Sequence, residues 1–279
     1  MKQLLNQQLM NRFRTLLIGT GVFTLMLIAL LSGCKKEEEK TTPVIPPASS
    51  FVMDFSDFSN PADTTGSRAI GSYHNWGYSY INVVTWNAVL TVGLAIPVAA
   101  FNESFNHQAV YHPDENNWTW SYNVTANNSV YEAELTGYLQ ADSVVWEMRL
   151  TRDNLYTDFL WFHGKSALNQ SGGYWILMDN PLNPVTLLKI DWNRYAGNSA
   201  DIKYTNIVPG GPDNGSYIFY GIVAGEYNRF YEIYNHAADN LTDIEWNAES
   251  RVGHVKDPVH FGDALWHCWD TNLMDTTCP

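Results

Sequence analysis

The chain has 279 residues, of which 45% are hydrophobic and only 16% are charged, and its formal net charge is −13. An aromatic content of 14% excludes an intrinsically disordered chain, because disorder requires few aromatic residues and low hydrophobicity. With 16 basic residues against 29 acidic ones, the chain does not fit a nucleic-acid partner, which needs a basic surface that neutralises phosphates. Its three cysteines are too few for a scaffold held together by many disulfides.

The amino-terminal segment has the pattern of a secretory signal. Three basic residues and no acidic residue precede an almost wholly apolar run over residues 16–31. A basic segment followed by an apolar one is typical of a signal peptide. The apolar run is short for a membrane-spanning helix, which needs about 20 residues.

The tetrapeptide Leu31-Ser32-Gly33-Cys34 closes this run. It resembles the lipobox of bacterial lipoproteins, a family in which the chain is cut before the cysteine and lipid is attached to its thiol and its new amino group. The resemblance implies a signal peptide over residues 1–33 and a lipid anchor on Cys34, stable because several acyl chains are attached. The alternative is an uncleaved signal anchor. Cleavage would leave 246 residues with 13 basic and 29 acidic side chains, a net charge of −16.

Residues 34–50 are expected to form a tether. A charged hexapeptide (KKEEEK, 35–40) precedes a stretch rich in Pro, Ser and Thr, a composition that favours an extended, semi-rigid linker. The hexapeptide resembles the export signal of Bacteroidota surface lipoproteins, which directs them to the outer face of the outer membrane. The resemblance implies a lipid-anchored protein of the outer membrane that faces the cell surface; a solvated spacer and the periplasmic face are the alternatives. A single folded domain is expected over residues 51–279.

Residues 82–102 are apolar nearly all round, which predicts a buried helix. Asn82 is placed to cap the start of this helix, and Pro97 to kink it or to end its first segment. The run is too interrupted by polar residues for a membrane span. Two strands are the alternative, because Val and Thr are frequent in the segment.

From Trp118 onward, apolar and polar residues alternate with a period of two, as in residues 118–124, 131–136 and 146–151. Each such strand has one apolar and one polar face, which is typical of an antiparallel sheet covered on one side. Turn-forming Asn, Asp and Gly residues separate the runs. The pattern predicts about eleven strands between residues 118 and 257.

An open sheet with this many strands tends to curl or to close. The sequence therefore predicts a mainly β fold, a long antiparallel meander that forms a strongly curved sheet or an incomplete barrel around the apolar helix, with a β-sandwich as the alternative. This architecture resembles the open-barrel family of periplasmic lipoprotein carriers, without a shared sequence motif. The resemblance implies an apolar groove for acyl chains, unless the helix fills it completely.

Familiar catalytic motifs are missing from the sequence, which has no G-x-S-x-G, no H-E-x-x-H and no dinucleotide fingerprint after a strand. Glu132 and Glu134 share a strand face at about 7 Å, a spacing compatible with glycoside hydrolysis. Solvent-facing positions paired across strands with Arg149 are the simpler explanation. Whether the protein is an enzyme stays open, with the balance against it.

The densest group of imidazole and carboxylate side chains lies near the carboxyl terminus and comprises His254, Asp257, His260, Asp263, His267 and Asp270. The candidate metal ligands within it are His254, Asp257, His260 and His267. Imidazole and carboxylate groups together suit zinc, manganese or iron. Their spacing matches no known signature. A divalent-metal cofactor and a metal-assisted hydrolase are therefore an alternative, and a polar loop packed against neighbouring tryptophans is the simpler interpretation.

Cys268 and Cys278 form an even pair once Cys34 carries lipid, and an oxidising compartment favours a disulfide between them. The bond would pin the carboxyl-terminal tail and contribute about 2–3 kcal/mol. Free thiols are the alternative.

The aromatic excess is the remaining candidate for function, because Tyr and Trp stack on sugar rings and line apolar pockets. The candidate ligand-binding residues are Trp161, Trp175, Tyr220 and Tyr231, although about half of such strand positions face the core. The preferred function is a non-enzymatic binding module for an apolar or glycan ligand, anchored in the membrane by lipid. A structural or interaction component of a cell-surface complex is a further alternative, with its protein partner unidentified.

Overall fold

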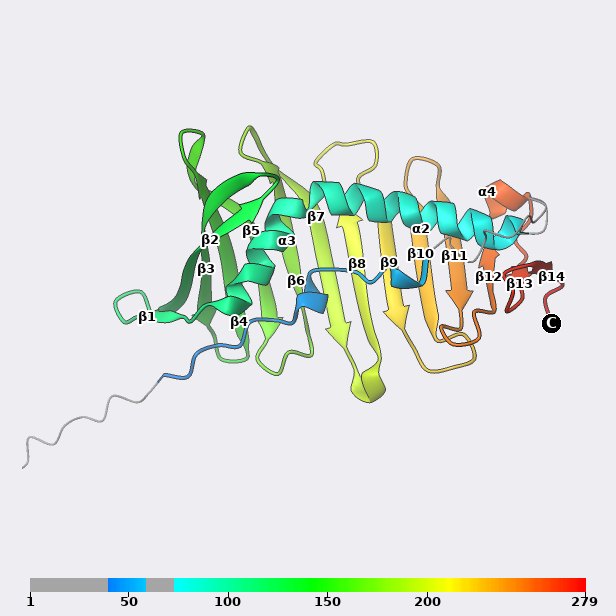
Figure 1. The fold of residues 1–279 in the computed structure, drawn as a ribbon, viewed down its shortest axis with the longest axis horizontal. Helices are drawn as coiled ribbons and strands as arrows, with labels where there is room; N and C mark the ends of the chain where they lie inside the picture. The colour runs from blue at the N-terminus through cyan, green and yellow to red at the C-terminus, as the bar shows by residue number, and fades with distance from the viewer. Residues whose placement is uncertain (1–39, 59–72) are drawn as a thin grey trace, which may run out of the picture. The chain divides into compact units, whose positions relative to one another are not determined.

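A 14-stranded antiparallel sheet organises the structure, a computed structural model that describes residues 40–58 and 73–279 (Figure 1). The strands are hydrogen-bonded in sequence order, so neighbours in the sheet are also neighbours along the chain. Antiparallel neighbours need only short turns, which the Asn- and Gly-rich segments supply. The strands are β1 (Val110–His112), β2 (Asn117–Ala126), β3 (Ser129–Leu139), β4 (Ser143–Arg152), β5 (Tyr156–Ala167), β6 (Gly172–Asn180), β7 (Asn183–Arg194), β8 (Ala200–Asn206), β9 (Tyr217–Ile222), β10 (Arg229–Asn235), β11 (Asn240–Trp246), β12 (Gly253–Lys256), β13 (His267–Trp269) and β14 (Asp275–Thr276).

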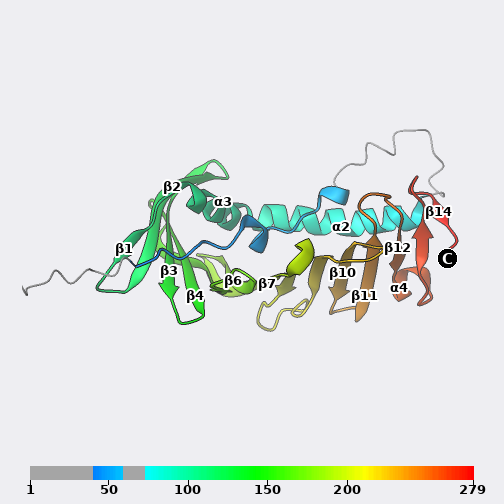
Figure 2. The same ribbon diagram turned by 90° about the horizontal axis from the view of Figure 1, so that it is seen from below.

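The predicted fold class is confirmed. Among the described residues, β1 and β14 lie at the two edges of one open sheet, and β2 to β12 occupy the region where about eleven strands were expected. The end of the sheet that contains β1 to β6 curls around a helix (Figure 2).

The helices that cover this sheet lie on one of its faces (Figure 2). The long helix α2 (His74–Gly93) crosses the strands, and α3 (Ala95–Glu103) packs against β2. The remaining helical turns are short. They are η1 (Ala48–Ser50), η2 (Ser56–Phe58), η5 (Ser104–Asn106), η6 (Ala196–Asn198) and α4 (Pro258–Phe261).

The expected apolar helix is present, but its ends differ from the prediction. The helix begins at His74, two turns before Asn82, whose side-chain amide donates to the Tyr78 carbonyl from inside α2 at 3.0 Å. The chain bends between α2 and α3 at Gly93, four residues before Pro97. A proline ring clashes with the carbonyl four residues earlier and provides no N–H for it, so Pro97 breaks the helix one turn upstream of its own position.

The prediction that this helix is buried all round is wrong for α2. Ile81, Val89 and Val92 are 64%, 60% and 79% exposed, because the sheet covers only one side of the helix. Within the described chain, no single helix is long and apolar enough to cross a membrane; α2 and the helical segment that follows it meet that test only as a pair bent by 68°.

The amino terminus of α2 is capped from the other end of the chain. The Asp275 carboxylate in β14 accepts hydrogen bonds from the backbone N–H groups of His74 and Asn75 at 3.1 and 2.9 Å. The Asn75 side chain in turn donates to the Cys268 carbonyl at 2.9 Å. A carboxylate at a helix amino terminus satisfies unpaired N–H groups and complements the helix dipole, so the carboxyl-terminal strands hold α2 in place.

Residues 42–58, which we call the strap, run beside α2 on the same face of the sheet (blue in Figures 1 and 2). Phe51 is fully buried, and its carbonyl accepts from the Tyr204 hydroxyl at 2.8 Å. The same hydroxyl accepts from the Met53 N–H at 2.9 Å. The compact unit therefore starts at Thr42, and residues 42–50 belong to it instead of to the expected tether.

Cross-strand pairs of glycine and tryptophan pack the covered face of the sheet. Each indole lies across a glycine of the neighbouring strand, and a methyl group added to the glycine would come within 2.3 to 3.1 Å of the indole. The four tryptophans are at most 1% exposed. Glycine thus provides the space for a flat, fully buried ring, an arrangement known to support strand register. The pairs are Gly137–Trp146, Gly164–Trp175, Gly173–Trp192 and Gly253–Trp269.

Candidate functional site

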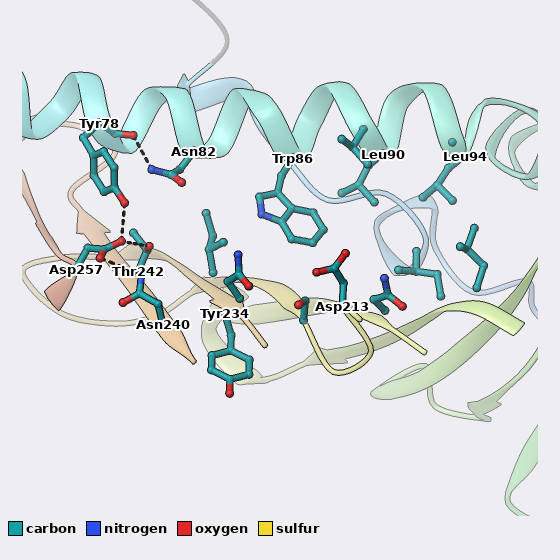
Figure 3. Close-up of a pocket in the computed structure, with 18 residues that line it drawn as sticks. Tyr78, Asn82, Trp86, Leu90, Leu94, Asp213, Tyr234, Asn240, Thr242 and Asp257 are labelled. Atoms are coloured by element: carbon teal, nitrogen blue, oxygen red, sulfur yellow. Dashed lines mark hydrogen bonds between the residues drawn. The ribbon is translucent and has the colours of Figure 1, made fainter. Parts of the chain in front are cut away.

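A groove of about 470 Å³ lies between α2 and the strands β7 to β11 (Figure 3). One wall is a stripe of side chains from α2 and from Leu94 directly after it, which recur every fourth residue along one side of the helix. This stripe changes from polar at its amino-terminal end to apolar at its other end, with the indole of Trp86 in the middle. Its members are Tyr78, Asn82, Trp86, Leu90 and Leu94.

The sheet supplies the floor and the opposite wall. Leu188 and Ile233, each 7% exposed, form an apolar floor. The polar wall comes from the ends of the strands and from the β8–β9 loop, where the chain turns and amide side chains terminate the ladder. It contains Asn206, Asp213, Ser216, Asn235, Asn240 and Thr242.

Two asparagines of this wall are held by their own turns. The Asn206 side-chain oxygen accepts from the Val208 N–H at 3.0 Å, and that of Asn235 accepts from the Ala238 N–H at 3.1 Å. These bonds fix the orientation of each amide. Within the described chain, the NH₂ group of each side chain has no hydrogen-bond partner, so both keep donors for a ligand.

Acceptors complement these donors. The Asn240 amide donates to Asp257 at 2.9 Å, which leaves its side-chain oxygen available. The Asp213 carboxylate is exposed and has no hydrogen-bond partner among the described residues. In Figure 3 it points toward the side of the groove where Trp86 lies. The groove therefore combines an aromatic ring with both donors and acceptors.

One end of the groove is closed by Asp257, whose side chain is 1% exposed. Its carboxylate accepts from the hydroxyls of Tyr78 and Thr242, each at 2.5 Å. It also accepts from the Asn240 amide and, at 3.0 Å, from two backbone N–H groups in the first turn of α4. Burial by itself would raise the pKa of Asp257, but these hydrogen bonds outweigh it and hold the pKa below its usual value.

The hydrogen bond between Tyr78 and Asp257 also affects the pKa of the tyrosine. Burial, followed by the hydrogen bond to Asp257, raises the pKa of Tyr78 to about 12. The tyrosine is thus a neutral donor and Asp257 a charged acceptor at neutral pH. Together they join α2, β11 and α4 (Figure 3).

The electrostatic character of the groove is acidic. None of the described residues that line it is a lysine, an arginine or a histidine, and two are aspartates. Anions are repelled at such a site, most strongly where burial reduces screening.

The structure does not bring the predicted metal ligands together. The His254 ring in β12 hydrogen-bonds to Glu245 at 3.0 Å and stacks on Trp266, and burial lowers the pKa of this histidine. The His260 ring in α4 instead stacks on Tyr78 with 3.6 Å between ring centroids. Each ring is used in packing.

The other two candidates are also engaged elsewhere. His267 hydrogen-bonds to Asp263 at 3.0 Å and stacks on Phe261, and Asp257 accepts the five hydrogen bonds described above. Among the described residues, no group of three or more His, Cys, Asp or Glu side chains is arranged to hold a metal ion. The candidates are close in sequence but lie on different elements: His254 on β12, Asp257 and His260 at α4, and His267 on β13.

The predicted ligand-binding aromatics lie in the core instead of the groove. Trp161, Trp175, Tyr220 and Tyr231 are 6%, 0%, 5% and 1% exposed. The Trp175 indole donates to Ser50 of the strap at 3.4 Å, and Tyr220 borders a smaller cavity of about 180 Å³ beside the strap. The aromatic residues that line the groove are Tyr78, Trp86 and Tyr234. The sequence reasoning missed Trp86, although its place in the four-residue stripe marks it.

The paired carboxylates Glu132 and Glu134 line a separate hollow on β2 to β5. Arg149 lies opposite Glu134 in the sheet, but it forms ion pairs with Glu147 at 3.2 Å and Asp158 at 3.1 Å. Arg149 therefore pairs with Glu147 of its own strand and with Asp158 of β5, instead of with Glu132 and Glu134 as expected.

Cys268 and Cys278 are joined by a disulfide with 5.2 Å between their Cα atoms. Cys34 lies outside the described residues. No family model, no curated protein and no solved structure matches this chain. The candidate site therefore rests on its own geometry and chemistry.

Proposed function

We propose that the protein is a non-enzymatic binding module that takes an apolar or glycan ligand into the groove between α2 and β7 to β11. The observation that carries this proposal is the groove itself, in which polar side chains with unused hydrogen-bonding capacity surround Trp86 above an apolar floor. Its volume of about 470 Å³ is typical of small-molecule sites, and so is the combination of an apolar lining with a few fixed polar groups.

Binding is favoured over catalysis by the state of the groove's buried carboxylate. Asp257 already accepts five hydrogen bonds from described residues. A general base needs a free acceptor within reach of the proton that it removes. Asp257 therefore supports the architecture of the groove and has no position left for a reacting group.

The proposed location is the outer membrane, with lipid on Cys34 and the folded unit facing the cell surface. The signal segment, the cysteine that closes it and the charged hexapeptide support this location. Labelling of cells with an alkyne-bearing palmitate tests it. The wild type is expected to incorporate the label and Cys34→Ala to lose it, and label on the variant would contradict the proposal. Digestion of intact cells by added protease distinguishes the cell surface from the periplasmic face.

The binding function is tested by native mass spectrometry of the full chain extracted from its own membranes. The wild type is expected to carry a ligand or to take one up from lipid and glycan arrays, and Trp86→Ala to lose it. Trp118→Ala is the matched control, because Trp118 is a partly buried tryptophan on β2, outside the groove. A ligand-free mass together with no binding on either array would contradict the proposal.

A further inference from the structure

We propose that the ligand of this groove is an uncharged saccharide, with one sugar ring stacked on Trp86 and its hydroxyls bound by Asn206, Asn235, Asn240 and Asp213. The inference rests on the proposed function and names the class of its ligand. Three properties of the groove support it: its charge, its unused hydrogen-bonding groups and the indole surface of Trp86.

The charge of the groove disfavours anionic ligands. Asp213 and Asp257 face it, and no cationic side chain is among the described lining residues. A fatty-acid carboxylate, a phosphate headgroup, a uronic acid or a sulfated sugar would meet repulsion without a compensating partner. The ligand is therefore neutral or cationic.

The unused polar groups disfavour an acyl chain. A hydrocarbon in the groove would cover the amide donors of Asn206 and Asn235 and the acceptor of Asn240 without replacing their bonds to water. Polar groups that are buried without partners oppose binding. The ligand must therefore offer hydrogen-bonding groups along the polar wall.

A cation would use only part of this arrangement. Trp86 and Asp213 could both attract an ammonium group, but the donors of Asn206 and Asn235 would face it with the wrong polarity. Hydroxyl groups, in contrast, both donate and accept. They match a wall that presents amide donors beside a carboxylate and an amide oxygen.

The indole provides the remaining contact. Trp86 is half-buried and lies between polar neighbours on one side and Leu90 on the other (Figure 3). The C–H faces of a sugar ring are apolar, whereas its rim carries hydroxyls, so such a ring fits a flat aromatic surface bordered by polar groups. This pairing uses the indole together with the polar wall beside it.

Isothermal titration calorimetry tests the inference on the full chain in a detergent without sugar headgroups. The probes are neutral oligosaccharides of hexoses, pentoses and N-acetylhexosamines in α and β linkage. Three further probes represent the other ligand classes: trigalacturonate for anions, monopalmitin for acyl chains and tetramethylammonium for cations. At least one neutral oligosaccharide is expected to bind, with Trp86→Ala weakening its affinity about tenfold and Trp118→Ala leaving it unchanged.

A second variant pair tests the hydrogen-bonding wall. Asn235→Asp keeps the side-chain oxygen that accepts from Ala238 and removes the amide donor, so the saccharide is expected to bind more weakly at an unchanged melting temperature. Asn87→Asp introduces the same charge on α2 away from the groove lining and is expected to leave binding unchanged.

The outcomes separate the two proposals. Binding of monopalmitin, trigalacturonate or tetramethylammonium without any neutral saccharide would overturn the saccharide and leave the binding function intact. Saccharide binding that is equally strong in Trp86→Ala would overturn the groove as its site. No binding by any probe, with a ligand-free mass from membranes, would overturn both proposals.

Discussion

At the scale of single residues, Asp257 shows how a buried charge is kept in this fold. A buried carboxylate is unfavourable unless hydrogen bonds replace its water, and here two hydroxyls, an amide and two backbone N–H groups do so. Because the bonds favour the ionised form, the pKa of Asp257 is lowered. A lowered pKa of a carboxyl group in the folded state stabilises the fold above the pKa of the unfolded chain, and this contribution is lost as the pH falls through the folded pKa.

We therefore predict that Asp257→Asn lowers the free energy of unfolding at pH 7 by about 1.5–3 kcal/mol. The wild type should lose this difference as the pH falls below about 4, so the two stability curves should converge in acid. Chemical denaturation between pH 7 and pH 2 measures both effects. Asp213→Asn, at an exposed carboxylate of the same groove, is the control and should change little. Parallel curves for Asp257→Asn and the wild type would contradict the assignment.

Glycine is the other residue on which packing depends. At Gly164, an added methyl group would lie 2.2 Å from the Tyr174 carbonyl and 2.6 Å from the Trp175 indole. Gly77, inside α2, has nothing within 4 Å of such a group. The same substitution should therefore have opposite effects at the two positions.

We predict that Gly164→Ala destabilises the fold by about 1–3 kcal/mol through overpacking. Gly77→Ala should stabilise it by about 0.5–1 kcal/mol, because alanine is the better helix former. Thermal unfolding of the two variants beside the wild type provides the test. Equal melting temperatures for both would show that the fit of indole against glycine is unimportant.

At the scale of elements, the groove depends on how α2 is held at its two ends. At one end Pro97 breaks the helix at Gly93, so that α3 can follow the curled part of the sheet. At the other end Asp275 caps the first turn from β14. The Cys268–Cys278 disulfide encloses β14, so the bond that pins the tail also positions the cap.

Asp275→Ala is predicted to lower the free energy of unfolding by about 1 kcal/mol, the usual effect of losing a helix cap. The joint replacement of Cys268 and Cys278 by serine should cost about 2–3 kcal/mol. Because both act through β14, the triple variant should lose less than the total of the two effects. Denaturant unfolding of the four proteins measures the coupling, and strict additivity would show that the disulfide does not position the cap.

At the scale of the whole folded unit, two different segments cover the same face of the sheet. The strap fills the space between α3, β5 and β6 with Phe51, whose ring lies 4.8 to 5.8 Å from those of Phe101, Phe162 and Trp175. Between α2 and the strands β7 to β11, the side chains do not fill the space, and the groove remains there. The larger hollow of about 470 Å³ therefore lies along the helix, and the smaller one of about 180 Å³ lies beside the strap.

We predict that Phe51→Ala destabilises the protein by about 3–5 kcal/mol, as expected for a phenylalanine removed from a core. Val52→Ala is the neighbouring control, since Val52 is 41% exposed, and should have a small effect. Unfolding monitored by circular dichroism compares them. If both variants were as stable as the wild type, residues 42–58 would be a tether and not part of the unit.

The local structure of the chain can be predicted from its sequence. Alternation along residues such as Trp118 to Val124 specified antiparallel strands, because a period of two allows one face to be buried and the other to meet water. The apolar run before β1 specified a helix, and Pro97 specified a break in it. These features depend on neighbours within a few residues, which the sequence shows directly.

Which side chains meet depends on the packing of distant segments, and the sequence does not predict it. In the structure, Trp175 and Tyr231 are buried in the core, whereas Trp86 lines the groove. The Asp257 carboxylate accepts hydrogen bonds from Tyr78 and Thr242 and is not part of a metal site among the described residues. These outcomes depend on how α2 and the strap divide one face of the sheet between them. Contacts between residues more than 150 positions apart, such as that of Asp275 with His74, leave no periodic trace in the sequence.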